Sequence, residues 1–162
     1  MTRRYWLIKS EPETFSFDDL LASPGRTTPW DGVRNYQARN LMRDDMQVGD
    51  GVVFYHSNAK PPGIAGFAEV ASEAYPDPTQ FDPADAHFDS KSDAAAPRWL
   101  LVDIAAVEPA RRFVPLDELK AEPALAEMAV VQRGSRLSVQ PVTAAEWRTV
   151  RRLAGLGPAK KP

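Results

Sequence analysis

The sequence predicts one α+β domain built around a small antiparallel β-barrel of about five or six strands. Short apolar runs bounded by turn residues outnumber helical patterns, and the strands do not alternate regularly with helices, which argues against a doubly wound sheet. The 162-residue length suits a single hydrophobic core. Without a repeat or an internal linker, we expect one domain over residues 1–156 and a frayed tail over residues 157–162.

The elements are expected in a simple order along the chain. Strands are predicted by apolar runs over residues 5–9, 52–57, 64–74, 99–107 and 137–142. Capping residues open three helices, which are expected over residues 16–22, from Asn35, and from the Thr143–Glu146 capping box to Gly155. Residues 116–120 and 123–128 predict short helical turns. Residues 75–97 are rich in Pro and Asp, and loops of this length are usually functional or partly disordered.

Composition excludes several classes of protein. Hydrophobic residues make up 43% and charged residues 26%, as in a globular protein, and no apolar run approaches the roughly 20 residues of a membrane-spanning helix. The absence of cysteine excludes disulfides, zinc fingers and thiol catalysis. Two histidines, His56 and His87, argue against a catalytic metal, and no cofactor is expected. Without an export signal or a disulfide, the expected location is the cytoplasm.

Charge is unevenly distributed along the chain. Residues 71–97 hold six acidic residues against one lysine, whereas residues 132–162 hold seven basic residues against one glutamate. The C-terminal part therefore predicts either a basic face for a few phosphates or a solvated surface that is merely polarised.

The segment Trp30–Asn40 has the chemistry of a ligand pocket. It places a tryptophan, arginines, asparagines and a glutamine at the junction of a loop and a helix. Tryptophan offers a stacking face, arginine a bidentate donor, and amides both donate to and accept from a nucleobase edge. Taken singly, Trp30 suits a core and Asn35 a helix cap, but the combination favours a pocket.

Three further segments carry polar groups at the ends of predicted strands. Lys9–Glu11 follows the first strand, Tyr55–Asn58 ends the strand over residues 52–57, and Arg133–Gln140 surrounds the start of another. The adjacency of His56 and Ser57 is not evidence of a catalytic triad, and the chain has no Gly-x-Ser-x-Gly motif. Taken singly, these segments also suit surface ion pairs or exposed loops.

Together and in this order, these segments resemble the EVE domain family of the PUA-like superfamily. The resemblance rests on Tyr5–Pro12, Trp30–Asn40, Phe54–Asn58 and Arg136–Val142, with shorter matches over residues 49–50, 63–66 and 75–78. It implies a PUA-like fold, a small bent antiparallel or mixed barrel surrounded by short helices. It also implies a non-catalytic reader whose partner is a nucleic acid, DNA or RNA, with one modified base, a modified cytosine, held in a pocket.

The resemblance also implies roles for individual residues. Trp30 is expected to stack on or wall the base, and Arg34, Asn35 and Tyr36 to orient the pocket or contact the base edge. Lys9 and Ser10 are expected on the opposite wall, with a rim made of Tyr55, His56, Ser57 and Asn58. Phosphate contacts are expected from Arg39, Arg136 and Ser138. Asp31 and Glu11 are expected only to hold the arginines in place.

Two other functions compete with this one. An amidohydrolase of the same superfamily, resembling the ASCH type, needs Lys9 as base, Ser10 or Ser57 as nucleophile and Glu11 nearby. A protein-interaction module that uses residues 75–97 predicts an exposed apolar patch on that loop and no aromatic-lined pocket.

Overall fold

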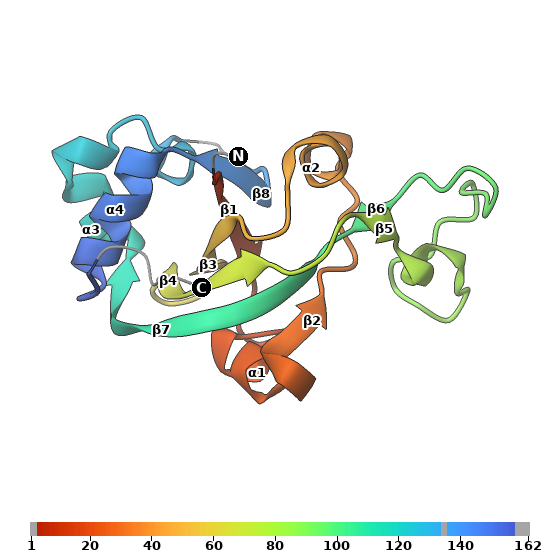
Figure 1. Cartoon of the computed structure of the whole chain (residues 1–162), viewed down its shortest axis with the longest axis horizontal. Coiled ribbons are helices and arrows are strands. Elements are labelled where there is room, and N and C mark those ends of the chain that lie inside the picture. Colours follow the sequence, from red (N-terminus) through yellow and green to blue (C-terminus); the bar gives the residue numbers. More distant parts are fainter. Residues whose placement is uncertain (1–2, 134–135, 158–162) are drawn as a thin grey trace.

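A curled, mixed six-stranded sheet forms the body of the protein (Figure 1). The structure, a computed structural model, describes residues 3–133 and 136–157, so the expected tail lies outside them apart from Gly157. The strands, in their order across the sheet, are β2 (Thr27–Pro29), β7 (Asp103–Pro115), β4 (Gly63–Val70), β3 (Gly51–His56), β1 (Tyr5–Ser10) and β8 (Val139–Val142). Only β1 and β3 pair in parallel, and the other neighbours are antiparallel. The predicted α+β class and strand number are confirmed.

Short helices surround the sheet. They are α1 (Phe17–Ala22), α2 (Tyr36–Asn40), α3 (Leu116–Ala121) and α4 (Ala144–Leu153), and α2 continues into a π-helical turn over Leu41–Asp45. The predicted caps are confirmed: Ser16 and Thr143 form capping boxes, and the Asn35 side chain accepts from Ala38 N. No helix in the described part of the chain is long and apolar enough to cross a bilayer.

Two hydrophobic clusters lie on the two faces of the sheet. Successive side chains of a strand point to opposite faces, so Ile8 and Phe54 join one cluster while Leu7 and Tyr55 join the other. The first cluster packs against α1 and the segment after β2, and the second packs against α3 and α4. Figure 1 shows β7 running between the two ends of the molecule, with α3 and α4 at one end and β6 at the other.

Two predicted strands have different bounds. The strand expected over residues 64–74 ends at Val70, and the chain then turns into β5 (Tyr75–Pro76), which pairs with β6 (Leu100–Leu101). The strand expected over residues 99–107 is β6 followed by β7, which extends to Pro115. Pro109 obscures this extension in the sequence, because it occupies an irregular pairing opposite Gly66.

The acidic segment over residues 75–97 is a series of turns made by its aspartates. Each aspartate accepts a hydrogen bond from the backbone N–H two residues further on, at Asp77, Asp82, Asp85, Asp89 and Asp93. Gln80, which is fully buried, bonds to the backbone of Trp99 through both its amide oxygen and its amide nitrogen. The many aspartates of residues 75–97, which show no helical or strand periodicity, therefore stabilise turns.

Candidate functional site

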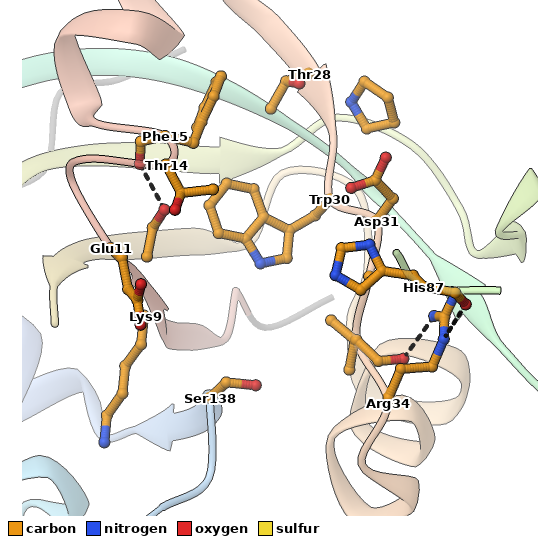
Figure 2. A pocket seen from close by; sticks show the side chains of 14 residues that line it. Lys9, Glu11, Thr14, Phe15, Thr28, Trp30, Asp31, Arg34, His87 and Ser138 are labelled. Carbon is orange, nitrogen blue, oxygen red and sulfur yellow. Dashed lines mark hydrogen bonds between the residues drawn. The ribbon is translucent and has the colours of Figure 1, made fainter. Parts of the chain in front are cut away.

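A cavity of about 670 Å³ opens beside the end of β1, the segment after β2 and the start of β8 (Figure 2). This volume lies within the range of small-molecule sites. Its lining comes from four separate parts of the chain: Lys9, Ser10, Glu11, Thr14, Phe15, Thr28, Pro29, Trp30, Asp31, Gly32, Val33, Arg34, His87 and Ser138.

Trp30 forms the aromatic wall. Its backbone N–H donates to Val102 O at 2.9 Å, which fixes it beside the sheet. Its ring meets Phe15 and Phe54 edge to face, with centroids 6.1 and 5.5 Å away. Figure 2 shows the indole nitrogen facing the space between Lys9, Ser138 and His87. Trp30 therefore packs against the core and lines the cavity at the same time.

Lys9 and Ser138 lie across the cavity from Arg34 (Figure 2), and Ser10 lines the same cavity. The backbone N–H of Lys9 donates to Ser138 O at 2.9 Å and so joins β1 to the segment before β8. Burial lowers the pKa of the Lys9 amine. The Ser10 hydroxyl donates to Phe15 O at 2.5 Å, so its proton is held by the protein.

Arg34 holds the distant loop over residues 75–97 against the pocket. A guanidinium has five N–H donors. Those of Arg34 bond to the carbonyls of His87 and Val33, the Asp77 carboxylate and the Thr79 hydroxyl, at 2.7 to 3.0 Å. Because every donor has a partner, Arg34 orients the pocket and has no N–H left for a ligand.

Asp77 receives Arg34 and is fully buried. Burial alone would raise the pKa of the Asp77 carboxyl, but hydrogen bonds from Thr79, Gly32 and Arg34 together hold that pKa below its ordinary value. Because Gly32 N donates to Asp77 at 2.8 Å, this carboxylate joins the segment after β2 to the loop. The expectation that Asp31 or Glu11 holds the arginines is wrong, since Asp77 holds Arg34, and Arg39 bonds to Asn40 and to Arg98 O.

Gly32 lets His87 approach the pocket. Its φ of +79° is left-handed, and a Cβ built there would lie 2.7 Å from the imidazole Cε1 of His87. The ring therefore rests on the glycine backbone and completes the wall beside Trp30 and Asp31 (Figure 2).

The second half of the segment over residues 30–40 turns away from the cavity. Asn35 caps α2, and Tyr36, which is largely exposed, stacks on Trp99 with centroids 4.8 Å apart. Arg39 lies over the Tyr36 ring and donates to Arg98 O at 2.9 Å. These residues build the support of the pocket and do not line it.

The four residues after Phe54, which were expected to form the rim, do not line the cavity. Tyr55 is buried in the cluster on the opposite face, and its burial raises the pKa of its phenol to about 12. His56 Nε2 accepts from Phe17 N at 3.1 Å, and burial lowers the pKa of this imidazole. Ser57 N donates to Ser10 O at 2.9 Å, and the Asn58 amide reaches Glu11 at 3.4 Å.

Of the three residues expected at phosphates, only Ser138 lines the cavity. Arg136 is exposed two residues earlier, whereas Gly134 and Ser135 lie outside the described residues. Sequence reasoning did not point to Thr14, Phe15, Thr28, Pro29 or His87, and it included Gly32 and Val33 only as parts of the Trp30–Asn40 segment. A glycine within a motif was a signal for Gly32, but no local pattern points to His87, which reaches the site from a distant loop.

No group of three or more histidine, aspartate or glutamate side chains suited to a metal ion occurs among residues 3–133 and 136–157. The lining groups instead suit a flat, polar organic ligand, because an aromatic wall faces hydroxyl, amine and carboxyl groups.

The curled mixed sheet and the aromatic-lined pocket at its edge define an α+β domain that is suited to binding a small, flat ligand. The family model described as the EVE domain matches residues 4–153, and the chain belongs to this family. The implied PUA-like α+β fold is confirmed.

Similar proteins come from distant organisms. Thymocyte nuclear protein 1 of Homo sapiens is 47% identical over 160 residues, which are 88% of this chain and 70% of that protein. A crystal structure of human THYN1 in complex with 5-methylcytosine-containing DNA is 44% identical, with a TM-score of 0.88 over 98% of this chain and 99% of that one. A crystal structure from Pseudomonas syringae is 45% identical, with a TM-score of 0.87 over 93% of this chain and 99% of that one.

Proposed function

We propose that the protein is a non-catalytic reader that binds one modified nucleobase, a 5-methylcytosine derivative in DNA, in the pocket beside Trp30. The observation that carries the proposal is the cavity itself, with an aromatic wall on one side and polar groups on the other. The human relative solved with 5-methylcytosine-containing DNA supports the same class of ligand.

The pocket provides what a base needs when it leaves its stack. Extrusion of a base costs a few kcal/mol, and the protein must return this energy by stacking and by hydrogen bonds to the base edge. Stacking on an aromatic side chain contributes about 1–3 kcal/mol per base. Trp30 supplies the aromatic surface, and Asp31, His87 and Ser138 lie around it with polar groups.

A panel of oligonucleotides tests the proposal. Single strands and duplexes of DNA and RNA, each with one 5-methylcytosine or its unmodified parent, are titrated against the wild type, Trp30→Ala and Trp30→Phe. We expect the modified DNA to bind most tightly, Trp30→Ala to weaken binding about 5- to 150-fold, and Trp30→Phe to restore part of it.

Phe81→Ala is the matched control, because Phe81 is a partly exposed aromatic residue that does not line the cavity. Thermal unfolding of each variant checks that it is folded. Equal binding of modified and parent oligonucleotides by the wild type would refute the reader function, and tighter binding of modified RNA would reassign the polymer.

One observation favours the amidohydrolase as a second candidate. Lys9 has a pKa lowered by burial and lines the same cavity as Ser10. Against it, the Ser10 hydroxyl donates to Phe15 O, and Ser57 does not line the cavity. Release of acetate from N4-acetylcytidine that disappears in Lys9→Met would establish this candidate.

The third candidate predicted an exposed apolar patch on residues 75–97 and no aromatic-lined pocket. Tyr75, Phe81 and Phe88 are partly exposed on that segment, but the pocket lined by Trp30 and Phe15 argues against this candidate. The expected cytoplasmic location stays a prediction, and the relatives named thymocyte nuclear protein 1 favour the nucleus instead.

A further inference from the structure

The polar groups of the pocket divide into those bonded within the protein and those open to a ligand. Arg34 has all five donors bonded, and the Ser10 hydroxyl donates to Phe15 O. The Asp31 carboxylate lines the cavity beside Trp30, and no described residue donates a hydrogen bond to it.

Asp31 is an exposed residue at the cavity, and charges of both signs surround its carboxylate. Burial raises the pKa of this carboxyl, the nearby carboxylates of Asp77 and Asp85 raise it further, and His87 and Arg34 act in the opposite direction. Arg34 is already paired with Asp77 at 3.0 Å. A ligand that brings an N–H donor to Asp31 would therefore stabilise the charged form and gain affinity from it.

We propose that Asp31 reads the exocyclic amino group of the bound base, so that the pocket accepts cytosine-type bases and rejects thymine and uracil. This inference rests on the proposed function. It gives Asp31 a role in specificity in place of the local structural role expected from the sequence.

The hydrogen-bonding groups on the edge of cytosine match those that line the cavity. Carboxylates accept from the N4 amino group of cytosine, whereas thymine presents the O4 acceptor at the same position. In the thymine complex, two acceptors would face each other without a hydrogen. The remaining cytosine edge offers acceptors, and the Trp30 indole N–H and the Ser138 hydroxyl are donors in the same cavity (Figure 2).

A comparison of 5-methylcytosine with thymine tests the inference, because both bases carry the C5 methyl group and differ at position 4 and N3. Each base is placed in a single strand and in a duplex opposite an abasic site, so that base pairing does not favour either. Affinities are measured for the wild type, for Asp31→Asn and for Asp117→Asn, which removes the same charge from an exposed position on α3.

The wild type and Asp117→Asn should prefer 5-methylcytosine over thymine by about 5- to 150-fold, the discrimination of one good base-edge contact. Asparagine both accepts and donates, so Asp31→Asn should reduce the preference to less than about 3-fold, mainly by tighter thymine binding.

An undiminished preference in Asp31→Asn would overturn the inference, as would a wild type that binds thymine and 5-methylcytosine equally while still preferring 5-methylcytosine over cytosine. In both cases the reader function would stand. Failure of the wild type to prefer any modified oligonucleotide over its parent would instead remove the proposed function, and the inference with it.

Discussion

At the scale of single residues, Arg34 and Asp77 show how a motif residue acts on the site without touching the ligand. Their ion pair spans 43 positions of sequence, and the Asp77 side chain is 0% exposed. The two main-chain contacts from Arg34 to His87 hold the loop residue that completes the pocket. The Arg34–Asp77 pair therefore holds in place the part of the cavity wall that His87 forms.

Removal of the Arg34 side chain should lower the free energy of unfolding of the whole protein. Arg34→Ala leaves a buried carboxylate without its cation, a change that costs about 3–5 kcal/mol in buried pairs. Because the hydrogen bonds from Gly32 and Thr79 remain on Asp77, we expect a loss at the lower end of this range. Chemical denaturation measures this loss as a change in the free energy of unfolding.

Arg43→Ala is the matched control, since the Arg43–Asp44 pair is 44% and 52% exposed and screened by solvent, so its loss should be much smaller than that of Arg34→Ala. Equal losses in the two variants would contradict the structural role given to Arg34.

At the scale of elements, the sequence predicts what is encoded locally. Ser16 and Thr143 form capping boxes with residues three positions later, and both helices begin where expected. Strand β2 was not foreseen, because it is three residues long and ends at a proline. Pairing with β7 makes it a strand, and that contact has no local signature.

In the candidate site, too, the local segment was predicted and the contact from a distant segment was not. The segment Trp30–Arg34 was predicted as pocket and lines the cavity, whereas Asn35 starts a helix that carries Tyr36 and Arg39 away from it. His87 lies in the aspartate-rich loop, and its position depends on Arg34 and on the bare backbone of Gly32. Such contacts between distant segments leave no pattern in the sequence.

The junction between these two segments can be tested at Gly32. Gly32→Ala adds a left-handed alanine, a cost of about 1–2 kcal/mol, and a methyl group 2.7 Å from the His87 ring. We expect His87 to leave the pocket wall and hydrogen exchange to rise in the loop over residues 77–99.

Gly25→Ala is the control, because Gly25 has a similar φ of +63° and no atom within 4 Å of the added carbon. It should show only the backbone cost and unchanged exchange in the loop. Unchanged protection of the loop in Gly32→Ala would show that the His87 contact does not hold it in place.

At the scale of the whole molecule, the sheet brings the ends of β1, β2 and β8 and a distant loop to one cavity, while the chain has a net charge of only -2. Phosphate contacts alone give strong, salt-dependent binding in basic proteins. Here recognition is expected to depend on a single base in the pocket.

The indole N–H signals of the four tryptophans test this central claim most directly. Trp6 donates to Asp50 at 2.9 Å, Trp99 donates to Asp89 at 2.8 Å, and the Trp147 nitrogen is buried. Only Trp30 lines the cavity. In a nitrogen–proton correlation spectrum, the missing peak of Trp30→Phe assigns the Trp30 signal.

Titration with DNA that carries one 5-methylcytosine should shift the Trp30 signal at concentrations where the unmodified parent has little effect, and should leave the other three signals in place. A Trp30 signal that stays unchanged while the DNA is fully bound would contradict the account, because the base would then lie outside this pocket.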